Sequence, residues 1–335
     1  MKDKAKSSDA GDNQLHAMND LIAELIEAEG LPDHFRSTVE RYFVPLAEEI
    51  AKRQRLLGQP MLVGINGAQG TGKSTLALFL QNMLTSQLNC PCARFSLDDL
   101  YRTHTDREWL ARKIHPLLAT RGVPGTHDLV LGQQTVNQLI NAGPTTETRI
   151  PVFDKAIDDR LPHSRWPIYT GVANVILIEG WCVGAQPEED SAKLAAPVNS
   201  LESEEDPEGI WREYVNIQLK GPYADFFGQL DMLIMLKAPS MECVLKWRTL
   251  QERKLANKRE NAPEKRKNES SSTGTDHCPS QKDQSRGIMS ADDLIRFIMH
   301  YERLTLAMLQ TMPARADAVL DVAEDHKITG LHWRE

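Results

Sequence analysis

Short apolar runs alternate with amphipathic stretches along most of the chain. Residues 61–65 form an apolar run that ends at Asn66 and Gly67. This run is too short for a helix and is typical of a buried parallel strand. Residues 73–88 then carry apolar side chains at helical spacing, which predicts an amphipathic helix. A strand, a glycine-rich turn and a helix in this order indicate the start of a βαβ unit.

The same alternation continues to the end of the chain. Further strands are expected at residues 93–97, 150–153, 175–178, 232–236 and 318–321. Further helices are expected at residues 15–29, 34–57, 134–142, 212–229, 239–254 and 290–309. The last of these has an apolar stripe that fits either core packing or a dimer surface. The pattern predicts an α/β fold with a doubly wound, mostly parallel sheet that is covered by helices on both faces.

Polar segments set the expected domain organisation. Residues 1–14 are expected to be disordered, residues 15–58 to form an N-terminal helical leader, and residues 59–335 to form the main domain. Two segments of that domain, at about 186–209 and 255–287, are hydrophilic. Since neither is expected to bury enough surface to offset its ordering entropy, both are interpreted as mobile surface insertions.

Composition excludes several classes of protein. The chain has 335 residues, of which 41% are hydrophobic and 26% charged, as in an ordinary globular protein. No run approaches the roughly 20 apolar residues of a membrane span, and the polar N-terminus resembles no targeting segment, so a cytoplasmic protein is expected. The five scattered cysteines argue against a disulfide framework. A net charge of −8 disfavours nucleic-acid binding and favours a small-molecule partner. The protein is expected to be a monomer or a homodimer.

One motif decides the chemistry. Residues 67–74, GAQGTGKS, fit the pattern G-x-x-x-x-G-K-[ST]. Phosphate oxygens need donors from many directions in a space too tight for side chains, and glycines let successive backbone N–H groups point inward beside a helix N-terminus. Lys73 is expected to reach the β and γ phosphates, and the Ser74 hydroxyl suits Mg2+. The motif thus predicts a P-loop that binds ATP with Mg2+. Its expected nucleotide-binding residues are Gly67, Ala68, Gln69, Gly70, Thr71, Gly72, Lys73, Ser74 and Thr75.

Acidic residues are needed as well, because the metal must be held and the nucleophile oriented. Glu179 directly follows an apolar run, as a Walker-B acid would, and Asp98 and Asp99 follow another predicted strand. The ligand crevice of an open α/β sheet lies beyond the carboxyl ends of its strands, so these acids are expected near the phosphates. Ser74 and Glu179 are the expected metal ligands. Asp99 fits a helix cap equally well, and the choice of Asp98 or Glu179 as the base stays open.

Five segments carry a resemblance to a known family. They are FSLDDLYRT (95–103), PLLATRGVPGTHD (116–128), VFDKAIDDR (152–160), IEGWCVG (178–184) and KWRTLQE (246–252). In these segments, and over about residues 60–325, the chain resembles D-glycerate 3-kinases of the plant type and their microbial relatives. Those enzymes belong with uridine kinase, phosphoribulokinase and pantothenate kinase among the P-loop metabolite kinases. The resemblance implies the fold of P-loop-containing nucleoside triphosphate hydrolases.

The resemblance also implies roles for individual positions. Asp98 is similar to the aspartate that accepts the proton of the substrate hydroxyl, and Arg248 and Arg253 look like lid arginines that clamp nucleotide phosphates. Arg121 is among the cations that could pair with the carboxylate of glycerate. The implied catalytic residues are Lys73, Asp98, Glu179 and Arg160. The implied acceptor-binding residues are Asp98, Tyr101, Arg102, His127, Asp128, Asp154, Lys155 and Arg160.

What the resemblance implies is a kinase that transfers the γ-phosphate of ATP to a hydroxyl of a sugar acid, D-glycerate above all. Two alternatives remain open. One is a kinase for another metabolite alcohol, such as a nucleoside or a pantothenate-like compound. The other is a nucleotide-binding ATPase or switch protein that admits no small acceptor.

Overall fold

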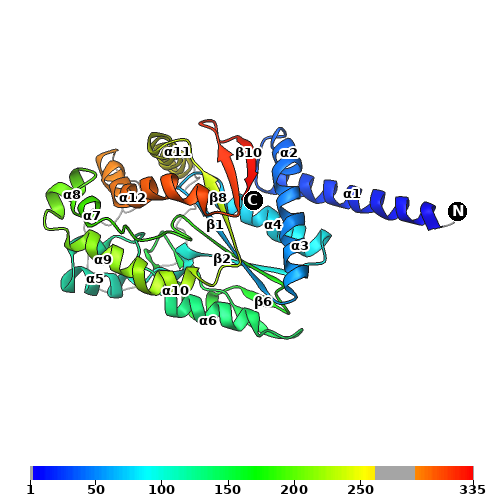
Figure 1. Cartoon of the computed structure of the whole chain (residues 1–335), viewed down its shortest axis with the longest axis horizontal. Coiled ribbons are helices and arrows are strands. Elements are labelled where there is room, and N and C mark those ends of the chain that lie inside the picture. Colours follow the sequence, from blue (N-terminus) through cyan, green and yellow to red (C-terminus); the bar gives the residue numbers. More distant parts are fainter. Residues whose placement is uncertain (1–2, 261–290, 335) are drawn as a thin grey trace, which may run out of the picture.

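A six-stranded sheet forms the centre of the molecule (Figure 1). The computed structural model describes the backbone of residues 3–260 and 291–334, and the side chains of residues 16–250 and 293–334. In spatial order the strands are β10 (Ile328–Trp333), β9 (Ala318–Val322), β8 (Met232–Lys237), β1 (Met61–Gly67), β7 (Val175–Gly180) and β2 (Cys92–Ser96). All neighbours are parallel except β10, which pairs antiparallel with β9 at the edge. The expected doubly wound, mostly parallel sheet is confirmed.

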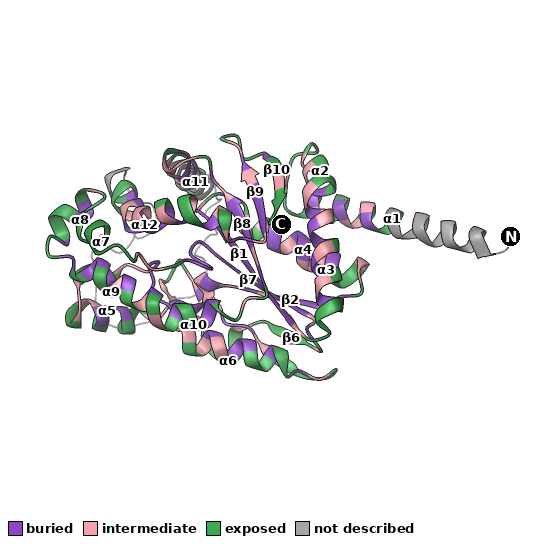
Figure 2. Ribbon diagram, viewed as in Figure 1, coloured by how far each residue is buried: buried purple, intermediate pink, exposed green. Residues whose placement is uncertain are grey.

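Alternate residues of the central strands enter two separate cores, because successive side chains of a strand point to opposite faces. In β1, Met61, Val63 and Ile65 pack into one core, whereas Leu62 packs into the other. The first core is completed by α1, α3, α4 and the start of α11, and the second by α6, α9, α10 and α12. Figure 2 shows that the central strands are buried over nearly their whole length. The carboxyl ends of the strands therefore provide a fixed platform for a site.

The helices cover both faces of this sheet. The N-terminal group and the helix after β1 are α1 (Asp3–Ala28), α2 (Phe35–Thr38), α3 (Val44–Leu57) and α4 (Lys73–Gln87). The middle group is α5 (His104–Lys113), α6 (Leu129–Ile140), α7 (Ser191–Ala195) and α8 (Ser200–Glu205). The last group is α9 (Ile210–Gln218), α10 (Ala224–Phe227), α11 (Met241–Glu260) and α12 (Ala291–Thr311). π-helical turns join α2 to α3 and α9 to α10.

Several expectations need correction. Residues 150–153 are not a strand of the main sheet, and the chain there passes between two short antiparallel strand pairs. One pairs β3 (Glu147–Arg149) with β6 (Ile168–Thr170), and the other pairs β4 (Phe153–Asp154) with β5 (Asp159–Arg160). Pro151 has no N–H to donate to a ladder, which explains the break. Helix α5 was not expected, since it buries only Arg107 and Leu110 and has no apolar stripe.

The ends of the chain also differ from expectation. The backbone is helical from Asp3 to Ala28, whereas the sequence predicted a helix only from residue 15. Polar residues do not prevent a helix when neighbouring turns continue it, and α1 anchors through Met18, Ile22 and Ile26. Strand β10 was missed because, of its six residues, only Ile328 is fully buried. Most of the expected insertion at 255–287 lies outside the described residues.

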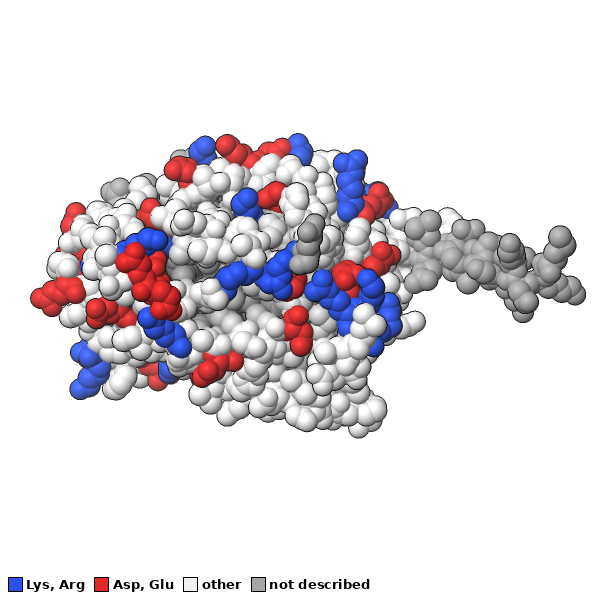
Figure 3. Space-filling model, in the orientation of Figure 1, with Lys and Arg blue, Asp and Glu red and all other residues white. Residues whose placement is uncertain are grey.

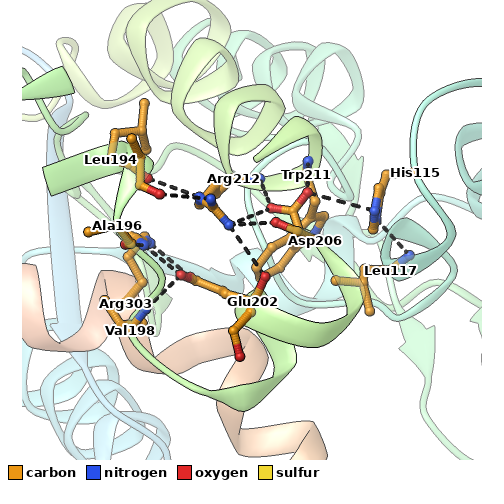
Figure 4. Close-up of polar contacts among 12 residues, drawn as sticks. His115, Leu117, Leu194, Ala196, Val198, Glu202, Asp206, Trp211, Arg212 and Arg303 are labelled. Atoms are coloured by element: carbon orange, nitrogen blue, oxygen red, sulfur yellow. Dashed lines mark hydrogen bonds and ion pairs between the residues drawn. The ribbon is translucent and has the colours of Figure 1, made fainter. Parts of the chain in front are cut away.

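The segment at 186–209 buries charged groups, although the sequence predicted that it would bury too little surface to become ordered. It folds into α7 and α8, and Glu202 and Asp206 are 0% and 1% exposed. Arg303 of α12 donates to Glu202 Oε1 at 2.8 Å, and Arg212 of α9 donates to Asp206 Oδ2 at 3.2 Å (Figure 4). Buried charges persist when paired and hydrogen-bonded. These partners lie up to about a hundred residues away along the chain, so local composition could not reveal them.

Charge is unevenly spread on the surface. On the face shown in Figure 3, acidic side chains gather over the end formed by α7, α8 and α9, and basic side chains lie in separate patches nearer the centre. This face has no continuous basic band of the kind that binds a nucleic-acid backbone. Among the described residues, no helix is long and apolar enough to cross a membrane.

Candidate active site

The P-loop joins β1 to α4 and closes tightly on itself. Gly70 and Gly72 have φ of 85° and 91°, a left-handed conformation that favours glycine. A Cβ on Gly67 would lie 2.6 Å from Thr71 Oγ1, so only glycine fits there. Thr71 Oγ1 donates to Ala68 O at 2.8 Å, which fixes the loop. Since Gly72 is the N-cap of α4, the first amides of that helix face the loop without a capping side chain.

Lys73 and Ser74, the last two residues of the motif, make contacts beside the loop. Lys73 Nζ donates to Ala68 O at 3.2 Å, folded along the loop. Burial lowers the pKa of Lys73, and the negative charges of Glu179 and Asp98 oppose that shift. Ser74 Oγ donates to Glu179 Oε1 at 2.8 Å. The parallel pairing of β1 with β7 places Ile65 opposite Glu179, so the acid at the end of β7 comes next to the start of α4.

Asp98 stands on a one-turn 3-10 helix, residues 97–100, directly after β2. Ser96 caps this turn by accepting from Asp98 N at 3.2 Å. The carboxylate accepts from Tyr101 OH at 2.8 Å and from Lys155 Nζ at 2.6 Å. Burial alone would raise the pKa of Asp98, but the Lys155 ammonium and the Tyr101 hydroxyl lower it to about 2. The group is therefore a fixed negative charge at neutral pH.

The neighbouring Asp99 has a different environment. Its carboxylate accepts from the backbone N–H groups of Ser96, completing a capping box, and of Phe153 at 3.2 Å. Burial raises its pKa to about 6, although these two hydrogen bonds oppose the shift. The helix-cap interpretation of Asp99 fits this arrangement, while the residue also borders the cavity.

One cavity of about 520 Å3 connects the P-loop to Asp98. A volume in this range is typical of small-molecule sites. Among the described residues, its lining from the P-loop and α4 is Gln69, Gly70, Gly72, Lys73, Ser74 and Thr75. The rest of the lining is Ser96, Asp98, Asp99, Tyr101, Arg121, Lys155, Glu179, Trp181, Arg248, Phe297 and Tyr301. The cavity thus joins most of the predicted nucleotide-binding residues to three predicted acceptor residues.

Five residues that were expected at the acceptor do not line the cavity. His127 is 1% exposed, stacks on Tyr101 with ring centroids 4.7 Å apart, and meets Tyr223 OH through Nδ1 at 2.5 Å. Burial lowers the pKa of His127 to about 3, so the imidazole is neutral. Arg102 donates to Gly125 O at 3.2 Å. This layer holds Tyr101 in place.

The remaining three members of this set stabilise turns. Arg160 donates to Tyr101 O at 2.9 Å and to Asp128 Oδ2 at 3.1 Å. Asp128 caps α6 by accepting from Leu131 N. Asp154 Oδ1 accepts from Ala156 N within the β4–β5 hairpin. In this structure, then, Arg160 is a support beneath Tyr101 and does not border the cavity, which differs from the catalytic role expected for it.

Tertiary structure brings further residues to the cavity, among them Arg121, which the sequence offered only as one of several cations for the acceptor carboxylate. Arg121 borders the cavity, forms an ion pair with Asp158, and has its guanidinium 5.7 Å from the centroid of the Phe153 ring. Tyr301 donates to Arg121 O at 3.0 Å. Trp181 donates to Gly122 O at 2.9 Å, so the indole both packs and borders the cavity. The charge of Arg121 within a segment of the family resemblance was the one available signal.

Helix α12 supplies another wall through Phe297 and Tyr301, where the sequence suggested only core or a dimer surface. Arg248 of α11 also borders the cavity, with its guanidinium 5.5 Å from the centroid of the Phe297 ring. Arg253 follows on the same helix, outside the residues whose side chains are described.

Comparisons with known proteins agree with this geometry. No family model matches the chain. The chain is 34% identical over 228 residues to the uncharacterized kinase mug58 of Schizosaccharomyces pombe, covering 65% of this chain and 79% of that protein. It is 30% identical over 196 residues to the chloroplastic D-glycerate 3-kinase of Arabidopsis thaliana, covering 56% of this chain and 40% of that enzyme.

A solved structure shares the fold. The D-glycerate 3-kinase from Cryptococcus neoformans var. grubii matches with a TM-score of 0.65 and 22% identity, covering 90% of this chain and 99% of that one. The sequence relationship to mug58 spans most of both proteins, and residues of the P-loop border one cavity with Asp98 and Glu179. The chain therefore belongs to the D-glycerate 3-kinase-like P-loop kinases, which use ATP to phosphorylate an alcohol group.

Proposed function

We propose that this kinase transfers the γ-phosphate of Mg·ATP to a hydroxyl of a small sugar acid, with D-glycerate as the first candidate. The observation that carries the proposal is that one cavity holds the phosphate cradle together with a fixed carboxylate, Asp98, and two cations, Lys155 and Arg121. The names of the Arabidopsis and Cryptococcus proteins support the choice of acceptor.

On the phosphate side, the P-loop amides and Lys73 supply positive charge to the β and γ phosphates. Ser74 and Glu179 present a hydroxyl and a carboxylate oxygen 2.8 Å apart, and such hard oxygen donors fit Mg2+. When bound, the metal neutralises charge that develops between the β and γ phosphates. Phosphoryl transfer passes through a loose transition state, so this side acts by positioning groups and stabilising charge.

On the acceptor side, Asp98 orients the attacking hydroxyl. A carboxylate with a pKa of about 2 is a weak base, but a loose transition state needs little proton removal before transfer. Tyr101 and Lys155 hold this carboxylate in place and ionised. We assign the orienting role to Asp98 because Glu179 is engaged with Ser74 on the phosphate side.

A carboxylate on the acceptor would find a cation in the same cavity. Arg121 can donate bidentately to a planar carboxylate, which a point charge cannot do. Lys155, whose side chain is 58% exposed, can follow the substrate. Both cations also pair with acids of the chain, Lys155 with Asp98 and Arg121 with Asp158. An acceptor carboxylate would share these cations, and a nucleoside offers no such anion, so the cavity favours an acidic acceptor.

The test is ADP release by the purified protein with Mg·ATP and D-glycerate, nucleosides or pantothenate as acceptors. The proposal expects the highest kcat/KM with D-glycerate or another small hydroxy acid. Turnover with only nucleosides or pantothenate would show that the acceptor is another alcohol and not a sugar acid. ATP hydrolysis that no acceptor stimulates would favour an ATPase or switch protein.

A further inference from the structure

The C-terminal hairpin touches the phosphate loop. Its turn, residues 323–327 between β9 and β10, brings His326 Nδ1 to 3.1 Å from Gly70 O. A carbonyl oxygen can only accept, so Nδ1 carries the hydrogen in this contact. The contact joins residues 256 positions apart in the chain.

Helix α11 enters the same contact. The His326 ring lies 4.6 Å from the Trp247 ring, centroid to centroid, and Trp247 Nε1 donates to Glu324 O at 2.9 Å. Trp247 also packs on the phosphate loop so closely that a Cβ added to Gly70 would lie 2.8 Å from Trp247 Cβ. The hairpin turn, α11 and the P-loop therefore meet at one point.

The turn presents His326 through its own backbone geometry. His326 has a φ of 66°, which a non-glycine residue adopts at some cost in energy. Ala323 N donates to Lys327 O at 2.7 Å, and His326 N donates to Ala323 O at 2.9 Å. This strained residue is held in place by the surrounding turn, an arrangement that is commonly found at functional positions.

The contact fixes a peptide group of the phosphate loop from both ends. Gly70 O accepts from His326, and the N–H of the same peptide group, which belongs to Thr71, donates to Ala68 O at 3.3 Å. With this group fixed, the glycine-rich loop has fewer conformations to lose when phosphates bind. Trp247 also adjoins Arg248, which borders the cavity, so the same contact ties the loop to the base of α11.

We propose that His326 is a positioning residue for nucleotide binding, which fixes the Gly70–Thr71 peptide group and thereby holds the neighbouring amides of the loop in place for phosphate. The inference rests on the proposed function, because it takes the loop to be the site of Mg·ATP. The residue acts through the loop and contacts no reacting atom.

The test compares His326→Ala and His326→Phe with the wild-type kinase. The phenylalanine keeps a ring next to Trp247 but has no N–H for Gly70 O. Both variants should raise the Kd and the KM for Mg·ATP about 3- to 10-fold, as expected for one hydrogen bond. The KM for the acceptor and the kcat at saturating ATP should change less than about twofold.

Lys327→Ala is the matched control, since Lys327 lies in the same turn and its side chain pairs only with Asp325 among the described residues. It should leave the Kd for Mg·ATP unchanged. Hydrogen exchange without nucleotide gives a second measurement, in which the phosphate-loop amides should exchange faster in both His326 variants than in the control. Wild-type Kd and exchange in the His326 variants would overturn the inference alone, whereas absence of Mg·ATP binding by the wild-type protein would overturn the proposed function with it.

Discussion

The two ends of the active-site cavity are built in different ways. The phosphate end comes mostly from one continuous segment, residues 67–75, and it acts largely through backbone amides. The acceptor end is collected from separate segments that contribute Asp98, Arg121, Lys155 and Tyr301 through their side chains. A backbone cradle depends on glycine conformation and is visible in a sequence motif. A side-chain constellation depends on how distant segments pack, so single substitutions should change it selectively.

The largest effect is expected from Asp98→Asn. The variant should lose about 10²- to 10⁴-fold in kcat, because the orienting carboxylate is gone, while the Kd for Mg·ATP stays near that of the wild type. Steady-state kinetics and calorimetry with Mg·ATP measure both quantities. Weaker nucleotide binding with a normal kcat at saturating ATP would place Asp98 at the phosphate end. That result would contradict the division of the cavity into a phosphate end and an acceptor end.

Lys73→Ala should impair the phosphate end of the cavity. Its kcat should fall about 10²- to 10³-fold and its Kd for Mg·ATP should rise, since the cation contacts phosphates in both the ground state and the transition state. The KM for the acceptor should stay close to its wild-type value. Near-normal kinetics in this variant would contradict the cradle.

Arg121→Met and Arg160→Met test which arginine contacts the acceptor. The structure places Arg121 at the cavity, whereas the sequence-based expectation gave the acceptor contact to Arg160. Loss of a charged hydrogen bond to the acceptor should lower kcat/KM for D-glycerate about 10- to 100-fold, mainly through KM. Arg160→Met is the matched comparison, because Arg160 supports Tyr101 without bordering the cavity. That variant should lower thermal stability and change kcat through Tyr101, while KM for the acid responds less. A larger KM effect at Arg160 than at Arg121 would reverse these assignments.

The smallest effect concerns Asp99, whose pKa of about 6 contrasts with about 2 for Asp98. A carboxyl group whose pKa is higher in the folded state contributes stability below its unfolded pKa of about 3.9, and this contribution is lost as pH rises through about 6. Relative to wild type, Asp99→Asn should therefore gain on the order of 1 to 2 kcal/mol in unfolding free energy between pH 4 and pH 7. Urea unfolding at both pH values measures this, and a pH-independent difference would contradict the raised pKa.

The P-loop and the acids Asp98 and Glu179 could be predicted from sequence because their signals are local. Gly67 to Ser74 have a fixed spacing, and Glu179 and Asp98 come directly after buried strands whose parallel pairing brings their carboxyl ends together. The strands of the main sheet could be predicted for the same reason, except β10, in which only one of six residues is buried. His127 and Arg160 illustrate the limit, since both lie in segments of the family resemblance yet do not border the cavity.

The sequence alone determined the class of enzyme and predicted the place of its phosphate cradle, because glycine spacing and strand hydrophobicity act within a few residues. Tertiary structure decided which side chains of the acceptor segments reach the cavity, that α12 forms one wall, and that Glu202 and Asp206 are buried against Arg303 and Arg212. These outcomes depend on which distant groups satisfy each buried charge and hydrogen bond, and that choice is made only when the segments pack.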